Sequence, residues 1–211
     1  MSVQALMRET DRRLAKWLGA GASPRVHRVL SVVEETAEGT KLWCGAAAVM
    51  VSLGGRRGRR AAVAGLAAVA LAQLASNGVC KQLADRPRPP KEWFPHDETE
   101  DRPDSSSFPS GHTAAAVAFT AAVAPTWPLA GAVCAVPAAM VAVERVQSGA
   151  HYPSDVAVGA AIGLTSAWLI RHAPNLVLRH WLQQRGVAPF AHLPCRPELP
   201  EAGSHRDRLL A

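Results

Sequence analysis

The sequence has little charge and few aromatic residues, which make up 19% and 5% of its 211 residues. Disordered chains are rich in charge and poor in apolar residues, whereas 48% of this chain is hydrophobic, so intrinsic disorder is excluded. The length fits one domain that can bury a core. The mean hydropathy of +0.02 resembles that of a soluble protein, but it averages apolar blocks with charged stretches. Composition therefore leaves a small polytopic membrane protein open.

Signals of several other protein classes are missing. The net charge is +6, but the basic residues form no stripe with interleaved aromatic residues, so we expect no nucleic-acid partner. The first 40 residues contain arginines and glutamates without a continuous apolar run, so we expect no secretory signal peptide. The cysteines lack the spacing of metal ligands, and we interpret them as packing residues. They are Cys44, Cys80, Cys134 and Cys195.

The apolar residues gather in five blocks, which predict an all-α fold: a polytopic membrane helix bundle of about five spans. Only the second block reaches the ~20 residues that a bilayer crossing needs, but shorter spans can tilt or thin the bilayer. Buried helices of a soluble protein are the alternative. The blocks are Leu42–Gly55, Ala61–Cys80, Thr113–Ala124, Pro128–Val143 and Val156–Ile170.

Two further patterns favour a membrane location. Trp43, Trp127 and Trp168 lie at or near block ends, where tryptophan anchors helices at the membrane interface. Gly159 and Gly163 have the small-xxx-small spacing that lets two helices approach closely. We therefore expect residues 41–172 to form a membrane-embedded core.

Two segments lie outside this core. In residues 1–40, Ser23 and Pro24 predict the start of an amphipathic helix that lies on the core or at the membrane interface; an ordinary packed surface helix is the alternative. Residues 173–211 form a basic tail, which we expect to be helical to about Gln184. The apolar face of the N-terminal helix comprises Val26, Val29, Leu30 and Val33.

The distribution of arginine predicts which segments face the cytoplasm. The stretch Arg56–Arg60 is the most basic short loop, so the positive-inside rule places it in the cytoplasm. Alternation then puts residues 81–109 and 144–155 outside the cell membrane, and residues 125–127 and the basic tail inside. The same alternation turns the N-terminus outwards despite its own arginines.

The two segments predicted outside hold nearly all the unusual polar residues. Fixed cations, a helix N-terminus and two histidines at one membrane face would form an oxyanion site. Cations neutralise phosphoryl oxygens, and free N–H groups at a helix start point at the anion. The residues of this site are Lys81, Arg88, Pro109-Ser110-Gly111-His112, Arg145, His151 and Asp155.

These motifs resemble those of the type 2 phosphatidic acid phosphatase (PAP2) superfamily, in its membrane lipid-phosphate phosphatase branch: K-x6-RP, then PSGH, then SR-x5-H-x3-D. The matching segments are Lys81–Pro89, Pro109–His112 and Arg145–Asp155. One departure is Glu144, where the family usually has serine; a carboxylate there would lower the local positive potential or hold Arg145. A second departure is that membrane members usually have six spans, so the amphipathic N-terminal helix would stand where the first span would be.

The resemblance implies a mechanism for the site. His151 would attack phosphorus and form a phosphohistidine, with Asp155 accepting from its other ring nitrogen. His112 would protonate the leaving oxygen and later deprotonate the attacking water. Because the cations supply the charge that a metal provides in other phosphatases, we expect no metal and no cofactor. The predicted phosphate-binding residues are Lys81, Arg88, Ser110, Gly111 and Arg145.

Two neighbouring features have other interpretations. Arg86 has the wrong spacing from Lys81, so we interpret it as a bystander in the loop. The run from His96 to Asp101 is interpreted as a solvated acidic loop, with a metal site as the alternative.

The sequence therefore predicts a hydrolase that acts on a phosphorylated lipid at the extracytoplasmic face of the cell membrane. The substrate would be an isoprenoid phosphate or diphosphate, a glycerolipid phosphate or a prenyl-phosphosugar. Two alternatives stay open. The same motifs occur in vanadium-dependent haloperoxidases, in which the cations hold vanadate. A non-catalytic membrane protein would bind anionic headgroups, but it would need neither His112 nor the His151–Asp155 pair.

Overall fold

The structure is a computed structural model that describes residues 3–20, 24–94 and 105–184. Within these ranges every regular element is helical, which confirms the predicted all-α class. The chain divides into two units, Met1–Ala173 and Pro174–Ala211. The helices are α1 Val3–Ala20, α2 Pro24–Ala37, α3 Lys41–Leu53, α4 Gly55–Gln73, α5 Lys81–Leu83, α6 Gly111–Val123, α7 Pro128–Gln147 and α8 Pro153–Gln184.

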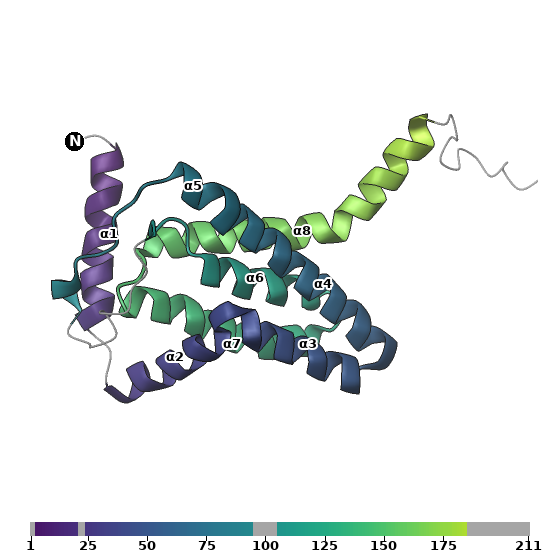
Figure 1. The fold of residues 1–211 in the computed structure, drawn as a ribbon, viewed down its shortest axis with the longest axis horizontal. Helices are drawn as coiled ribbons and strands as arrows, with labels where there is room; N and C mark the ends of the chain where they lie inside the picture. Colours follow the sequence, from purple (N-terminus) through teal and green to yellow (C-terminus); the bar gives the residue numbers. More distant parts are fainter. Residues whose placement is uncertain (1–2, 21–23, 95–104, 185–211) are drawn as a thin grey trace, which may run out of the picture. The chain divides into compact units, whose positions relative to one another are not determined.

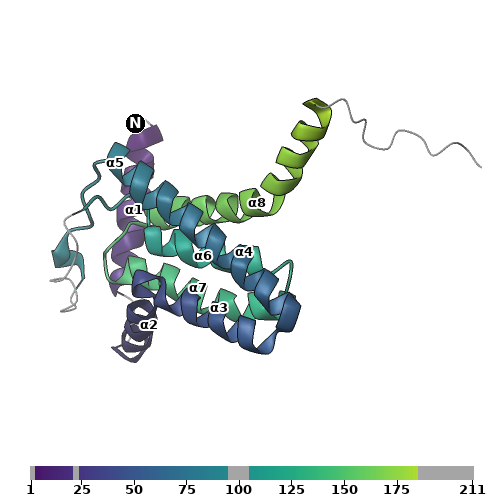
Figure 2. The same cartoon turned by 45° about the vertical axis from the view of Figure 1, so that its right-hand side comes forward.

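Helix α6 lies at the centre of the first unit, packed between α4 and α7, while α3 packs on α4 (Figures 1 and 2). Most of the buried residues of α6 are alanines, which favour helix and leave room for close helix contact. The largest side chains in this core are the rings of Trp43 and Phe119, whose centroids lie 5.3 Å apart. The core is therefore built by close backbone approach rather than by bulky side chains.

The close approach predicted for the two glycines of α8 is confirmed, and the neighbouring helix is α6. A Cβ atom at Gly159 would lie 2.4 Å from the carbonyl oxygen of Ser110. A Cβ atom at Gly163 would lie 2.6 Å from the carbonyl oxygen of Ala114. No side chain fits at either position, so glycine lets α8 lie directly against the backbone of α6.

Three helical segments are long and apolar enough to cross a membrane: Gly55–Leu83, Pro128–Gln147 and Pro153–Ala173. Helix α6 is apolar but has only 13 residues, and the first expected block forms α3, also of 13 residues. All five predicted blocks are thus helical. They form a bundle with the character of a membrane protein, and the total of five spans stays a prediction.

The arginine-rich stretch Arg56–Arg60 is helical rather than a loop. The turn between α3 and α4 is made by two glycines, and Gly55 adopts a φ of +50°. Arginine is a good helix former, so α4 begins immediately after this turn. The Nε–H of Arg57 donates to the carbonyl oxygen of Thr126 at 2.7 Å. The two segments predicted on the cytoplasmic side therefore lie at the same end of the bundle.

The amphipathic helix predicted near the N-terminus is confirmed as α2, which packs on α7. Leu30 is buried there, whereas Val26 and Val29 are exposed. Helix α1 was not expected from the sequence, and it packs on α7 as well. At the other end of the chain, the prediction that helix extends to Gln184 is confirmed, because α8 continues without interruption to that residue.

Candidate active site

The first motif follows the longest of the apolar helical segments. Helix α4 widens at its end into a π-helical turn, Leu74–Cys80, and Lys81 comes directly after it. Pro87, Pro89 and Pro90 follow, and proline does not allow a helix to continue. The guanidinium of Arg88 donates from Nη1 to the carbonyl oxygen of Ala150 at 2.8 Å, and from Nε to that of Ser105 at 3.2 Å. Backbone carbonyls therefore hold this cation beside the third motif.

The second motif starts α6. Ser110 is the N-cap, and its hydroxyl accepts from the N–H of the third helical residue at 3.4 Å. The N–H of Ser110 donates to the carbonyl oxygen of Asp155 at 3.1 Å. A Cβ atom at Gly111 would lie 2.7 Å from Oδ1 of Asn77, so glycine lets the helix start pack against the π-helical turn. His112 lies in this first turn, with 34% of its side chain exposed.

The third motif spans the turn from α7 to α8. Arg145 lies in the last turn of α7, and Gly149 adopts a φ of +65° that lets the chain reverse. The N–H of His151 then donates to the carbonyl oxygen of Arg145 at 2.9 Å. Helix α8 begins with proline, which is favoured there. Asp155 reaches back from the third helical position to accept from the N–H of Tyr152 at 2.9 Å, as in a capping box.

His151 is 3% exposed, and one nitrogen of its imidazole is hydrogen-bonded. Nδ1 lies 2.5 Å from the carbonyl oxygen of Ser107. A carbonyl can only accept, so Nδ1 carries the proton and the lone pair of the neutral ring lies on Nε2. Oδ2 of Asp155 lies 4.0 Å from Nδ1. The hydrogen bond that we expected from Asp155 is thus made by a backbone carbonyl, and the carboxylate of Asp155 lies within ion-pair distance of the ring.

The charges around His151 are strongly unbalanced. Burial lowers the pKa of His151 well below its ordinary value of 6.5, and the cations Arg88, Arg145 and Lys81 lower it further. The imidazole is therefore neutral at pH 7, as a nucleophile must be. Burial also lowers the pKa of Arg88, and the neighbouring charge of Arg145 adds to that shift. An anion between these cations would relieve their repulsion, so the site suits a phosphate group.

Two carboxylates hold Arg145. Its Nε and Nη2 lie 2.6 and 2.5 Å from Oε2 of Glu144, which is 1% exposed. Nη2 also lies 2.8 Å from Oε1 of Glu34 in α2. That same oxygen is 3.7 Å from Nε2 of His112. Of the two effects considered for Glu144, the geometry favours holding Arg145 in place. Glu34 carried no signal in the sequence, and it connects the N-terminal segment to the site.

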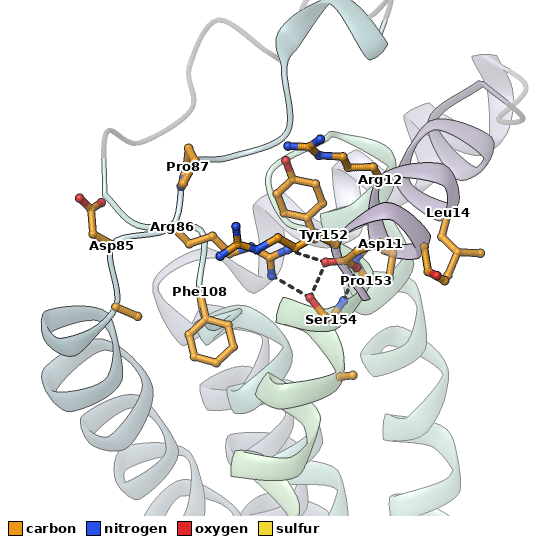
Figure 3. A pocket seen from close by; sticks show the side chains of 14 residues that line it. Asp11, Arg12, Leu14, Asp85, Arg86, Pro87, Phe108, Tyr152, Pro153 and Ser154 are labelled. Carbon is orange, nitrogen blue, oxygen red and sulfur yellow. Dashed lines mark hydrogen bonds and ion pairs between the residues drawn. The ribbon is translucent and has the colours of Figure 1, made fainter. Parts of the chain in front are cut away.

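Arg86 makes specific contacts, so its interpretation as a bystander is wrong. Its Nη1 lies 2.5 Å from Oδ1 of Asp155, and its Nη2 lies 2.5 Å from Oδ2 of Asp11 in α1. Its guanidinium also lies over the ring of Tyr152, 4.3 Å from the centroid. Figure 3 shows Arg86, Asp11 and Ser154 pointing toward one another in a pocket of about 1160 Å³. The motif spacing could not reveal a contact with a residue 75 positions away.

The structure brings the three predicted motifs together at one end of the bundle. The charges of Lys81, Arg88 and Arg145 act on both His112 and His151. In the part of the chain that the structure describes, no three or more His, Cys, Asp or Glu residues are grouped as metal ligands. The acidic run at residues 96–101, for which a metal site was the alternative, lies outside the described residues.

Sequence relatives of the chain are phosphatases. A family model described as the PAP2 superfamily matches residues 61–179, more than half of the chain. A lipid A 1-phosphatase of Rhizobium johnstonii is 48% identical over 65 residues, which are 29% of this chain and 24% of that protein. A lipid A 1-phosphatase of Rhizobium etli is 48% identical over 60 residues, which are 27% and 25%. The aligned region thus spans about a quarter of these curated relatives.

Two crystal structures share the fold over most of its length. One is the first transmembrane PAP2 type phosphatidylglycerolphosphate phosphatase from Bacillus subtilis, with a TM-score of 0.61 and 19% identity over 82% of this chain and 88% of that one. The other is LpxE from Aquifex aeolicus, with a TM-score of 0.58 and 23% identity over 75% and 92%. The motifs, the family match over residues 61–179 and this shared fold establish that the chain belongs to the PAP2 superfamily.

Proposed function

We propose that the protein hydrolyses a phosphomonoester or diphosphate of a membrane lipid through a phosphohistidine, without a metal ion. One observation carries the proposal. The contact of Nδ1 of His151 with the carbonyl oxygen of Ser107 leaves a lone pair on Nε2 of a neutral imidazole, in a setting dominated by cations. A buried neutral histidine that is surrounded by arginines and a lysine contributes little to stability, but its free lone pair can attack a bound phosphate.

In the first step, Nε2 of His151 attacks phosphorus. The N–P bond forms as the bond from phosphorus to the lipid oxygen breaks, and its electron pair leaves with that oxygen. The protonated form of His112, which the bound phosphate anion and Glu34 at 3.7 Å from its Nε2 stabilise, donates a proton to the leaving oxygen. The predicted phosphate ligands are the cations Lys81, Arg88 and Arg145, which spread the charge of the three remaining oxygens. The N–H groups at the start of α6 add further positive potential.

In the second step, water attacks the phosphohistidine. His112 accepts the proton of this water, the N–P bond breaks and its electron pair returns to Nε2 of His151. With a proton on Nδ1, the imidazole ring of the phosphohistidine carries a positive charge. The carboxylate of Asp155, 4.0 Å from Nδ1, stabilises this charge. The cations supply the charge neutralisation that a metal ion supplies in other phosphatases.

The substrate that we propose is a lipid, because the site lies where the apolar segments Gly55–Leu83, Pro128–Gln147 and Pro153–Ala173 begin or end. The relatives named above are phosphatases of lipid A and of phosphatidylglycerolphosphate. For this chain we propose the wider class of glycerolipid, isoprenoid and saccharolipid phosphates. We further propose that the chain crosses the cell membrane several times and carries the site on the extracytoplasmic face.

Phosphate release by the full chain, purified in detergent, from a panel of these lipids tests the proposal. We expect His151→Ala to lower turnover by about 10³-fold or more, because removal of a nucleophile leaves only binding and electrostatic effects. His172→Ala is the matched control. His172 lies in α8, about 25 Å along the helix from Asp155, and its ring stacks on that of Trp168. Turnover by His151→Ala at the control's rate would contradict the mechanism.

A further inference from the structure

Helix α1 reaches the candidate active site through one arginine. Arg86 donates from Nη1 to Asp155 and from Nη2 to Asp11. On the basis of the function proposed above, we infer that Asp11 and Arg86 are positioning residues, which hold the carboxylate of Asp155 beside His151 and keep its negative charge available to the ring. Asp11 lies in α1, outside residues 61–179 that match the family.

The first step of the argument is the burial of Asp155. Its side chain has no solvent exposure, and a buried carboxylate is stable only when it is paired and hydrogen-bonded. Its two oxygens have different partners: Oδ1 is 2.5 Å from Nη1 of Arg86, and Oδ2 is 2.9 Å from the N–H of Tyr152. Without Arg86, the ionised form of Asp155 would have no cation in direct contact.

The second step is that Arg86 is itself held in place. Asp11, 7% exposed, contacts Nη2 of Arg86 at 2.5 Å. Asp11 also accepts from the N–H of Ser154 at 3.0 Å and from its hydroxyl at 2.6 Å. That hydroxyl lies 2.7 Å from Nη1 of Arg86 (Figure 3). This closed set of contacts joins α1 to the first turn of α8, which carries Asp155.

The third step concerns charge. Arg88, Arg145 and Lys81 all disfavour a positive charge on His151, yet the imidazole ring of the phosphohistidine is positively charged when Nδ1 keeps its proton. Asp155 is the carboxylate nearest to that nitrogen in the described chain. If Arg86 were paired with Asp155 alone, its positive charge would cancel the negative charge of that carboxylate. Because Arg86 is shared between two carboxylates, the group keeps one net negative charge, and this role is distinct from a contribution to stability alone.

Steady-state kinetics of the full chain in detergent test this inference. We expect Asp11→Asn to lower kcat about tenfold, the lower end of the loss found when residues that orient metal ligands are replaced, with KM changed less than twofold. Glu9→Gln is the matched control: it also replaces a carboxylate of α1 that is paired with an arginine, Arg13, but that pair is exposed. We expect Glu9→Gln to keep the wild-type kcat. Equal kcat values for the two variants would overturn the inference.

A double-mutant cycle tests whether Asp11 acts through Arg86. We expect the effect of Asp11→Asn to disappear in the background of Arg86→Gln, because the arginine that it holds is then gone. Arg86→Lys keeps the charge and should recover part of the kcat lost in Arg86→Gln. Additive losses would overturn the inference, since Asp11 would then act independently of Arg86. If Arg86→Gln does not fold, the cycle is run on Arg86→Met, which also removes the charge and keeps an unbranched side chain, with the same two outcomes.

The titration of His151, followed by NMR of histidine-labelled protein and assigned with His151→Ala, needs no turnover. Removing the charge of Asp11 leaves Arg86 to neutralise Asp155, so we expect the pKa of His151 to fall in Asp11→Asn and to stay unchanged in Glu9→Gln. An unchanged titration in Asp11→Asn would overturn the inference. Absence of phosphate release by the wild-type protein would count against the proposed function instead, and this measurement would still decide the positioning role.

Discussion

Ser107 determines which nitrogen of His151 carries the proton. The group that accepts from Nδ1 is a backbone carbonyl at 2.5 Å, and a carbonyl does not titrate. The reactive tautomer is therefore kept over a wide pH range, whereas a carboxylate partner would lose its accepting charge on acidification. Asp155 supplies negative charge from 4.0 Å. The carbonyl of Ser107 thus fixes the tautomer of His151, and Asp155 supplies the negative charge. From the motifs alone, we expected Asp155 to do both.

The pH dependence of turnover follows from the burial of His151. Burial, with Arg88 and the other cations, lowers the pKa of His151 well below 6.5, so the neutral nucleophile persists below that pH. We expect the acid limb of kcat/KM to reflect this lowered value. Removing one cation in Arg88→Gln raises the pKa of His151 and should move the limb to higher pH, while the ionisation of the substrate is unchanged. A limb that stays in place or moves to lower pH would contradict this assignment.

Helices α6 and α8 bring the second and third motifs together. Gly159 lies on the face of α8 that meets the start of α6, where the N–H of Ser110 donates to the carbonyl oxygen of Asp155 at 3.1 Å. A Cβ atom at Gly159 would lie 2.4 Å from the carbonyl oxygen of Ser110. The contact is between backbones, so no change of side-chain rotamer can relieve it. Gly159 is the nearer to the two motifs of the two α8 glycines that make such contacts with α6, so their register and distance depend on it directly.

We expect Gly159→Ala to lower turnover by about 100-fold, because a displacement of about 1 Å between reacting groups has that effect. The melting temperature should fall as well. Gly45→Ala is the matched control: a Cβ atom there meets nothing within 4 Å, and alanine favours helix over glycine by about 1 kcal/mol. The control should keep full activity and gain slightly in stability. Equal turnover in the two variants would show that this helix contact does not set the geometry of the site.

The elements that the sequence predicted correctly are those with a local signal. The five apolar blocks became helices because apolarity persists along each of them. The third motif was recognisable because Arg145, His151 and Asp155 lie within eleven residues. Asp11 and Glu34 were missed, since each is an ordinary acidic residue on a polar helix and acquires its role only through a partner far along the chain. Periodicity and spacing carry no information about such contacts.

At the scale of the whole molecule, apolar side chains cover the outer faces of the long helices. On a soluble monomer, apolar surface of this extent would be unusual, whereas it matches the acyl chains of a bilayer. Within the described part of the first unit, Arg56–Arg60 lie at one end of the bundle and the cations of the candidate site lie at the other (Figure 1). The bilayer would then lie between them. The exposed apolar residues include Leu66, Leu74, Leu129, Val133, Val136 and Leu164.

This arrangement predicts that the two ends face opposite sides of the membrane. In a variant whose four cysteines are replaced, we expect Lys91→Cys to react with a membrane-impermeant maleimide in intact cells, because Lys91 is exposed three residues after Arg88. Arg59→Cys, exposed near the start of α4, should react only after the membrane is opened. Both must react equally in detergent, which controls for thiol reactivity. If only Arg59→Cys is labelled in intact cells, the chain has the opposite orientation in the membrane, and phosphate release occurs on the cytoplasmic side.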